Sequence, residues 1–177
     1  GFTTVPQPGL DGRRIPLPRG RVIGGSGSIN GMAYFRGQPA DYDAWAAAGN
    51  PGWSWREVLP YFLRSEDNAE HGPPGHARGG PIRVQHMPRV NPMNADFAAA
   101  FEHVGGYPRC DDFTGPAPEG YGLRQGTIRR GRRDSSARAY LHPARGRPNL
   151  TVLTGALVRR VLFDGLRARG VEIDGTD

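Results

Sequence analysis

The fold is decided by residues 18–37, which read PRGRVIGGSGSINGMAYFRG. Within them, Gly24–Gly31 is a run of small residues that lets a backbone approach a ligand closely. Successive backbone N–H groups bind anions, and Ser26, Ser28 and Asn30 add hydroxyl and amide groups. The run therefore suits a phosphate or the polar edge of a heteroaromatic ring. By pattern alone it also fits a flexible Gly/Ser loop, and it is neither a P-loop nor a Gly-x-Gly-x-x-Gly fingerprint.

Composition and charge narrow the class of protein. The chain has 177 residues, enough for one domain, and its 27 Gly and 17 Pro predict many turns and long loops. A net charge of +6 makes nucleic acid a candidate partner. The arginines are spread along the chain, and the cluster at 129–138 is interpreted as a solvated loop, so we expect no nucleic-acid partner.

Location and redox state are also constrained. Cys110 is the one cysteine, which excludes an intrachain disulfide. No apolar run approaches the ~20 residues of a membrane span, and no signal peptide is visible. We expect a cytoplasmic protein. The chain begins without Met, so we also expect it to be an internal piece of a longer protein.

Three helices are predicted. The first covers about 39–48, from Pro39 to Gly49, and the second opens with a capping box formed by Ser54 and Glu57. The third starts at Asn91-Pro92 and ends at Gly105-Gly106. One apolar face of this third helix is formed by Met93, Phe97, Phe101 and Val104. A further short helix runs through Tyr140, capped by Asp134 or Ser135.

Strands are predicted near 82–84, 123–129, 150–153 and 156–163. Asp164-Gly165 is a turn signal that leads into a strand through Val171 and Ile173, so the chain ends in a hairpin or part of a meander. Residues 1–23 and 66–80 are interpreted as loops.

The histidines and tryptophans have plain interpretations. His71 and His76 lie in a Gly/Pro-rich loop and are predicted to be solvated, with an active-site lid as the alternative. His103 is predicted on the surface of the third helix, and no metal spacing is present. The three tryptophans Trp45, Trp53 and Trp55 are predicted to pack in the core.

The string from Pro18 to Gly37 resembles the first signature of the glucose-methanol-choline (GMC) oxidoreductases. The resemblance continues through DYDAW (41–45), GWSW (52–55) and GRRDSSARAYL (131–141), and then RPNLTV (147–152). It covers nearly the whole chain in one order. The choline-dehydrogenase-like branch is the most similar.

The resemblance implies an α/β fold, with α+β character in this segment. Residues 1–65 would form part of an FAD-binding domain. Residues 66–148 would form part of an antiparallel-sheet substrate domain with connecting loops, and residues 149–177 would return to the FAD-binding domain as strands.

The resemblance also implies FAD as the cofactor and a small alcohol as the substrate. Ser26, Asn30 and Gly31 would make polar contacts with FAD, and Met32 and Ala33 would follow at the flavin. Val158 matches the position whose backbone meets the adenine end. The full set of cofactor-binding residues is Gly24, Gly25, Ser26, Asn30, Gly31, Met32, Ala33 and Val158.

The family's catalytic pair, a His base with a His or Asn partner, lies downstream of the matched region. We therefore expect no catalytic residue in this chain and no metal ligand, and we expect the isolated chain to be inactive. Two alternatives stay open: a truncated, non-catalytic flavin-binding module, and a basic nucleic-acid-binding protein. The sequence does not indicate the oligomeric state.

Overall fold

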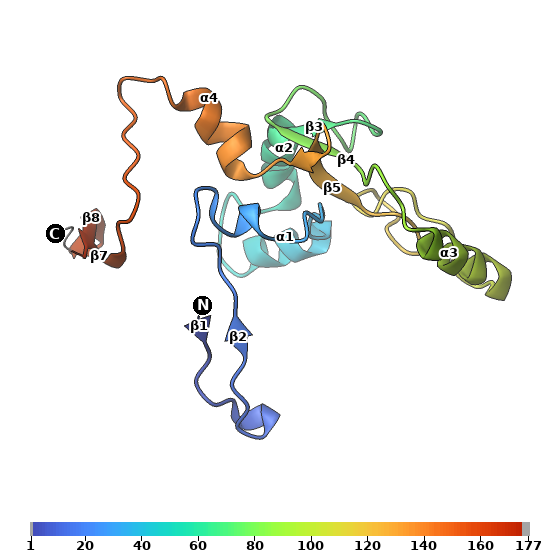
Figure 1. Cartoon of the computed structure of the whole chain (residues 1–177), viewed down its shortest axis with the longest axis horizontal. Helices are drawn as coiled ribbons and strands as arrows, with labels where there is room; N and C mark the ends of the chain where they lie inside the picture. Colours follow the sequence, from blue (N-terminus) through green and yellow to red (C-terminus); the bar gives the residue numbers. More distant parts are fainter. Residues whose placement is uncertain (1, 175–177) are drawn as a thin grey trace. The chain divides into compact units, whose positions relative to one another are not determined.

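The computed structural model describes residues 2–174, which form two compact units (Figure 1). The N-terminal unit runs to Pro143, and the C-terminal unit starts at Ala144. Residues 2–174 contain no helix that is both long and apolar enough to cross a membrane.

A four-stranded sheet forms the centre of the N-terminal unit. Its strands follow the order β3 (Glu66–Asn68), β4 (Ile82–His86), β5 (Gln125–Arg129), β6 (Arg132–Arg133). The pair β3–β4 is parallel and the other pairs are antiparallel. An isolated bridge joins Ala33 to Gly126, so the segment after Gly31 lies beside β5.

The two consecutive helices that were predicted from their capping residues are present. Helix α1 (Pro39–Ala47) begins at a proline, and α2 (Trp55–Ser65) begins after Ser54. The Glu57 carboxylate accepts hydrogen bonds from the backbone N–H of Ser54, at 3.2 Å, and from its hydroxyl. This satisfies a donor that the first turn of a helix cannot pair internally.

An aromatic cluster joins α1 to α2. The Tyr42 ring lies 5.3 Å from that of Trp45, 5.5 Å from that of Trp55 and 5.8 Å from that of Phe62, between centroids. Trp45 and Trp53 nevertheless stay 49 % and 50 % exposed. The predicted core role of the tryptophans is therefore wrong for these two, which lie at the surface.

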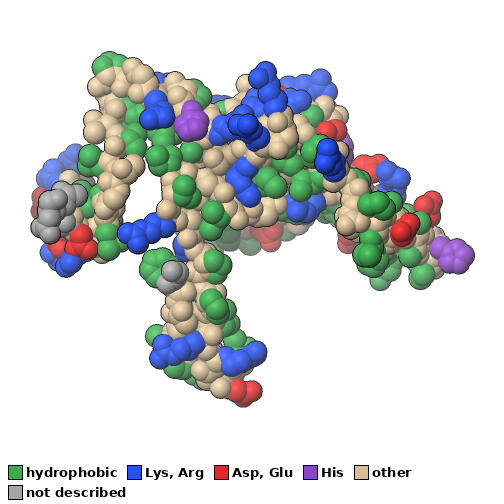
Figure 2. All heavy atoms as spheres, in the orientation of Figure 1, with side chains coloured by type: hydrophobic (Ala, Val, Ile, Leu, Met, Phe, Trp, Pro, Cys, Tyr) green, Lys and Arg blue, Asp and Glu red, His purple; other side chains and the backbone are tan. Residues whose placement is uncertain are grey.

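Helix α3 (Pro92–Val104) has the predicted bounds and cap. The Asn91 side chain accepts a hydrogen bond from the Met93 backbone N–H at 3.0 Å. On its apolar face, Phe101 stacks on Tyr121, but Met93, Phe97 and Val104 are 73 %, 66 % and 81 % exposed. In Figure 2, hydrophobic side chains lie at the surface over α3.

Two segments predicted as loops contain strands. Near the N-terminus, β1 (Phe2–Thr3) pairs antiparallel with β2 (Pro16–Leu17), around a short 3₁₀ turn η1 (Pro8–Leu10). In the 66–80 segment, Glu66–Asn68 forms β3. No apolar alternation marks these residues, because β3 is fixed by buried polar contacts and not by an apolar face.

The prediction that His76 is solvated is wrong: only 3 % of it is exposed. The other buried polar residues among those described are Arg36, Glu66, Asn68, Gln125 and Asp134. The buried hydrophobic residues among those described are Tyr42, Val84, Cys110, Ile128, Ala137 and Ala139. The interior therefore contains polar as well as apolar side chains. His71 is half-buried and His103 is exposed.

After β6, a π-helical turn η3 (Ala137–Leu141) leads into α4 (His142–Ala144). The expected cap by Asp134 is wrong. Its carboxylate instead accepts from the Arg83 backbone N–H at 2.7 Å and from Arg129 Nε at 3.1 Å, which joins β4 to β5. Ser135 contributes its backbone carbonyl, which accepts from the Ala139 N–H at 2.8 Å.

The C-terminal unit contains the predicted hairpin, formed by β7 (Val158–Asp164) and β8 (Arg167–Ile173). Gly165 turns the chain with a φ of 57°. The strand expected at 150–153 is absent, and these residues are extended without a ladder partner among the described residues. Every β7 side chain is exposed, so both faces of this hairpin are uncovered.

Candidate functional site

The Gly24–Ala33 loop, which contains most of the predicted site residues, has a backbone that only glycine adopts easily. Gly24 and Gly25 have φ values of 91° and 56°, in the left-handed region. A single 3₁₀ turn, η2 (Gly25–Ser28), follows them. Met32 also has a positive φ of 59°, which an ordinary side chain adopts only under constraint.

Close packing explains the first glycine. A Cβ on Gly24 would overlap the Ser28 hydroxyl and would lie 3.1 Å from Ala137 Cβ. The Ser136 hydroxyl donates to the Gly24 carbonyl at 3.4 Å. Residues 135–137 therefore pack against the loop at Gly24. By contrast, a Cβ on Gly25 or Gly31 would meet nothing within 4 Å, so the loop is open on that side.

Two arginines from distant parts of the sequence fix the end of the loop. Arg133 donates through Nη1 to the backbone carbonyl of Asn30 at 2.6 Å and to its side-chain oxygen at 2.7 Å. Arg124 donates to the Gly31 carbonyl at 3.1 Å. The Asn30 side-chain oxygen also accepts from the Met32 N–H at 2.9 Å. These bonds orient the Asn30 amide, leaving its nitrogen as a donor on an exposed residue.

The donors on the open side suit an anionic or heteroaromatic group. The Ser26 oxygen accepts from the Gly20 N–H at 3.2 Å, which leaves its proton available to a ligand. Ser26, Asn30, Gly31 and Ala33 are all exposed. A hydroxyl, an amide N–H₂ and a nearby guanidinium form a donor-rich surface without a carboxylate, which fits a phosphate or a polar ring edge.

Val158 belongs to the C-terminal unit. It opens β7, pairs with Ile173 and is 50 % exposed. Among the described residues β7 pairs with β8 alone. Its other edge therefore presents backbone N–H and C=O groups that can bind a partner.

A second constellation lies in the buried interior. Arg36 Nη2 is 2.6 Å from Glu66 Oε2, and His76 Nδ1 is 2.9 Å from Glu66 Oε1. His76 Nε2 is 3.0 Å from Asp112 Oδ2. Asn68 and Gln125 exchange amide hydrogen bonds of 3.0 and 3.1 Å beside them. The carboxylates, the histidine and the arginine form one continuous ion relay.

The relay shifts the pKa of each of its titratable members. The hydrogen bond to Glu66 raises the pKa of His76 against the opposing effect of burial, and Asp112 raises it further. Burial alone would raise the pKa of Glu66, but hydrogen bonds from His76 and Asn68 and the charge of Arg36 lower it. The pKa of Asp112 is likewise lowered against burial, by its bonds to Thr114 and His76.

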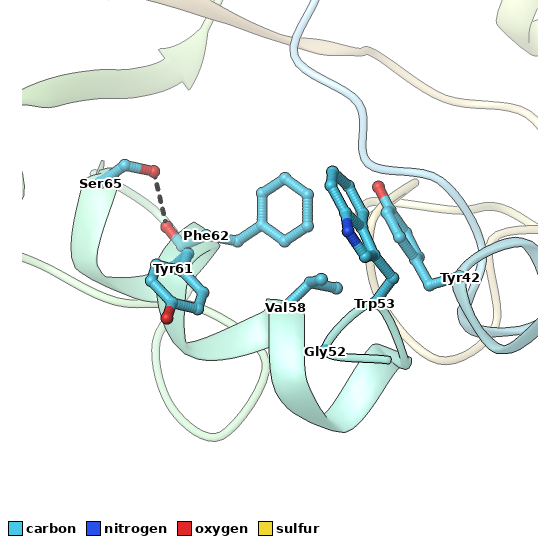
Figure 3. A pocket seen from close by; sticks show the side chains of 7 residues that line it. All are labelled: Tyr42, Gly52, Trp53, Val58, Tyr61, Phe62 and Ser65. Atoms are coloured by element: carbon cyan, nitrogen blue, oxygen red, sulfur yellow. Dashed lines mark hydrogen bonds between the residues drawn. The ribbon is translucent and has the colours of Figure 1, made fainter. Parts of the chain in front are cut away.

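A cavity of about 540 Å³ lies between α1 and α2 (Figure 3). Its lining is mainly aromatic, and the Phe62 ring points toward those of Trp53 and Tyr42. Ser65 contributes little polarity, because its hydroxyl donates to the Phe62 carbonyl at 2.9 Å. The titratable side chains of the cavity are those of Tyr42 and Tyr61, and none of the described His, Cys, Asp or Glu side chains lines it. Elsewhere in residues 2–174, no cluster of His, Cys, Asp or Glu is arranged to hold a metal ion.

A family model described as GMC oxidoreductase matches residues 3–177. The chain belongs to this family. As a GMC oxidoreductase it is 44 % identical over 174 residues to the oxygen-dependent choline dehydrogenase of Brucella anthropi, and 45 % identical over 176 residues to that of Sinorhizobium fredii. Each match covers 98 % of this chain and 31 % of the relative, so the chain spans about a third of their length.

Solved GMC oxidoreductase structures share the fold. Pyridoxine 4-oxidase from Mesorbium loti superposes with a TM-score of 0.83 at 39 % identity, over 98 % of this chain and 35 % of that one. An FAD-dependent oxidoreductase from Chaetomium thermophilum gives 0.86 at 32 % identity, over 98 % and 32 %. The expected fold class and the choline-dehydrogenase-like resemblance are confirmed.

The sequence identified the Gly24–Ala33 loop but did not reveal the residues that hold it in place. Arg133 was assigned to a solvated loop, whereas it bonds Asn30 directly. Arg129 is also engaged, while Arg130 and Arg132 are exposed. The available signal was that the string 131–141 belongs to the same family resemblance as the loop. His76 had no such signal, because its partners are 10 and 36 residues away.

Proposed function

We propose that this chain is a segment of an FAD-dependent oxidoreductase that oxidises the CH–OH group of an alcohol. The segment holds the middle of the FAD site and part of the substrate domain. Family membership supports the chemistry, and the FAD-dependent structural relative supports the cofactor. FAD, when bound, accepts the hydride that leaves the alcohol carbon.

One observation carries the proposal: the Gly24–Ala33 loop is rigidly supported on one side and open on the other. Ser136, Arg124 and Arg133 fix its backbone, whereas nothing lies within 4 Å of a Cβ built on Gly25 or Gly31. A flexible Gly/Ser loop would not need these supports. A surface prepared in this way suits a large rigid cofactor.

Each predicted contact has a role in this proposal. The Ser26 hydroxyl and the Asn30 amide donate to the cofactor, and Gly31 lets the backbone approach it. Met32 and Ala33 would follow at the flavin ring, and the backbone of Val158 would meet the adenine end. Gly24 and Gly25 shape the turn. By the family resemblance, the histidine base that would take the alcohol proton lies outside residues 1–177.

The test uses the complete gene product that contains residues 1–177. Purified protein should show a flavin absorbance spectrum, and anaerobic addition of a primary alcohol should bleach it. Choline is the first alcohol to try, given the names of the relatives. A folded product that neither carries nor takes up FAD would overturn the proposal. Bound FAD that no alcohol reduces would instead favour the non-catalytic flavin-binding module.

The 177-residue chain alone provides the complementary experiment. We expect weak or no retention of FAD and no alcohol-dependent flavin reduction, because the contacts are distributed over more chain than this segment. Turnover by the isolated chain would contradict the assignment of the base to another segment.

A further inference from the structure

The buried ion relay contains a histidine that the proposed function does not use. His76 places Nδ1 at 2.9 Å from Glu66 and Nε2 at 3.0 Å from Asp112. Ionised carboxylate oxygens accept hydrogen bonds and donate none. Both ring nitrogens must therefore carry protons, which makes the side chain an imidazolium.

A count of the neighbouring protons agrees. The Asn68 side-chain oxygen accepts from the backbone N–H groups of Glu70 and His71, which fixes the orientation of its amide. Its two N–H bonds then go to Glu66 Oε1 and Gln125 Oε1, each at 3.0 Å. The same amide nitrogen lies 3.1 Å from His76 Nδ1, but its two protons are directed to these nearer oxygens. Nδ1 therefore supplies its own proton to Glu66 Oε1, 2.9 Å away.

The relay reaches the flavin-contacting segment through Arg36. This residue follows Ala33 by three positions, and its guanidinium donates to Glu66 Oε2 at 2.6 Å and to the Gly75 carbonyl at 2.7 Å. Gly75 precedes His76 in the chain. The same few atoms therefore hold the histidine and the end of the segment.

A second route passes through β5. Gln125 bonds Asn68 with its side chain, and its backbone carbonyl accepts from the Tyr34 N–H at 3.1 Å. Two residues on, the Thr127 N–H donates to the Met32 carbonyl at 2.9 Å. Residues 32–36 are thus held at one end by β5 and at the other by the relay.

We propose that His76 is a positioning residue whose imidazolium form holds Glu66 and, through it, the Arg36 end of the segment that places Asn30–Ala33 against FAD. This inference rests on the proposed function, because the position of that segment matters for activity only if it contacts the cofactor. His76 makes no contact with the reacting atoms.

The charges around His76 set the direction of the pH dependence. Glu66 faces it from β3 and Asp112 from the loop before β5, and the His71 ring lies 5.2 Å away between centroids. The partners raise the pKa of His76, so its contribution is complete below its unfolded pKa of about 6.5. It is lost as pH rises through the raised value.

The experiment measures FAD affinity against pH in the complete gene product, together with hydrogen exchange of the Met32–Arg36 amides. In the wild type, affinity should fall and exchange should quicken as His76 deprotonates. His76→Gln should bind FAD more weakly at neutral pH, on the order of tenfold, or about 1.4 kcal/mol. Its affinity should no longer change across that pH range.

Two further variants separate positioning from damage to the fold. Asp112→Asn removes one of the two negative charges that raise the pKa of His76, so the pH at which affinity falls should move lower. His71→Gln, beside the relay but outside it, should match the wild type. If His76→Gln does not fold, the inference is tested by whether the midpoint of FAD affinity against pH shifts in Asp112→Asn.

Unchanged affinity and pH profile in folded His76→Gln, or an unchanged midpoint in Asp112→Asn, would overturn the inference. Failure of the wild type to bind FAD would instead overturn the proposed function, and hydrogen exchange of Met32–Arg36 would still test the relay.

Discussion

Two glycines of the Gly24–Ala33 loop, Gly24 and Gly31, have different physical roles. Gly24 is needed by the protein itself, because its φ is left-handed and a Cβ there would meet Ser28 and Ala137. Gly31 is not, since a Cβ there would meet nothing within 4 Å. Its small size matters only if something outside the described residues approaches it.

In the complete gene product, Gly31→Ala should therefore lower FAD affinity, on the order of tenfold, and should change the free energy of unfolding by no more than about 0.5 kcal/mol. Gly24→Ala should lower both quantities. Titration with FAD and denaturant unfolding measure the two effects. Gly72→Ala is the matched control, because its Cβ also meets nothing within 4 Å. An unchanged affinity in Gly31→Ala would remove Gly31 from the cofactor site.

Burial decides which ion pair matters for stability. Arg36 and Glu66 have side chains 2 % and 0 % exposed, so Arg36→Met leaves a buried carboxylate with one cationic partner fewer. In the complete gene product, we expect a loss of about 3 kcal/mol in the free energy of unfolding, measured with denaturant. Arg109→Met breaks an exposed pair with Asp111 and should leave the unfolding midpoint unchanged. Equal effects would show that burial is not the controlling factor.

Among the elements, helix α3 depends on its cap. Asn91 satisfies the Met93 N–H, while Asn94, one turn on, makes no side-chain hydrogen bond within residues 2–174. Asn91→Ala should weaken the helix by about 1 kcal/mol. Asn94→Ala should be neutral or slightly stabilising, because alanine favours helix. Hydrogen exchange of the α3 amides measures both, and similar protection in the two variants would refute the role of the cap.

Elements with local signals were predictable from the sequence. Pro39, the Ser54–Glu57 box, Asn91 and the Asp164-Gly165 turn mark boundaries that the structure confirms. Strand β3 was missed because Glu66 and Asn68 are polar, and their burial depends on partners up to 57 residues away. The 150–153 segment was predicted as a strand from its apolar residues, but it lacks a ladder partner among the described residues.

The site was predictable in part for the same reason. The Gly24–Ala33 loop was identified by family resemblance, and its glycine conformations follow from local sterics. Its supports, Arg124 and Arg133, lie 93 and 103 residues away from the atoms that they bind. No spacing rule connects such positions, so only the folded structure reveals them.

At the scale of the whole molecule, apolar surface outweighs apolar core. Within residues 2–174, 30 large hydrophobic side chains are exposed, against six buried hydrophobic residues. A hairpin of two strands, such as β7–β8, is marginally stable by itself. These faces are suited to burial against further polypeptide, in keeping with a chain that spans 31 % of its curated relatives.

The purified 177-residue chain should therefore bind a hydrophobic dye strongly and should melt without a sharp transition. Dye fluorescence and circular dichroism on heating test this. The complete gene product that contains residues 1–177 should show weak dye binding and cooperative melting in the same experiment. A cooperative transition without dye binding in the 177-residue chain would show that its own contacts suffice.

Cys110 offers a way to time how often the N-terminal unit opens. It is 5 % exposed, and its backbone N–H donates to the Tyr121 carbonyl at 2.8 Å, two positions before Asp112. A thiol in this position reacts with an alkylating reagent only while the surrounding chain is open. The 177 residues contain a single cysteine. The rate at which its peptide is alkylated, measured by mass spectrometry, therefore reports how often the surrounding chain opens, and no substitution is needed.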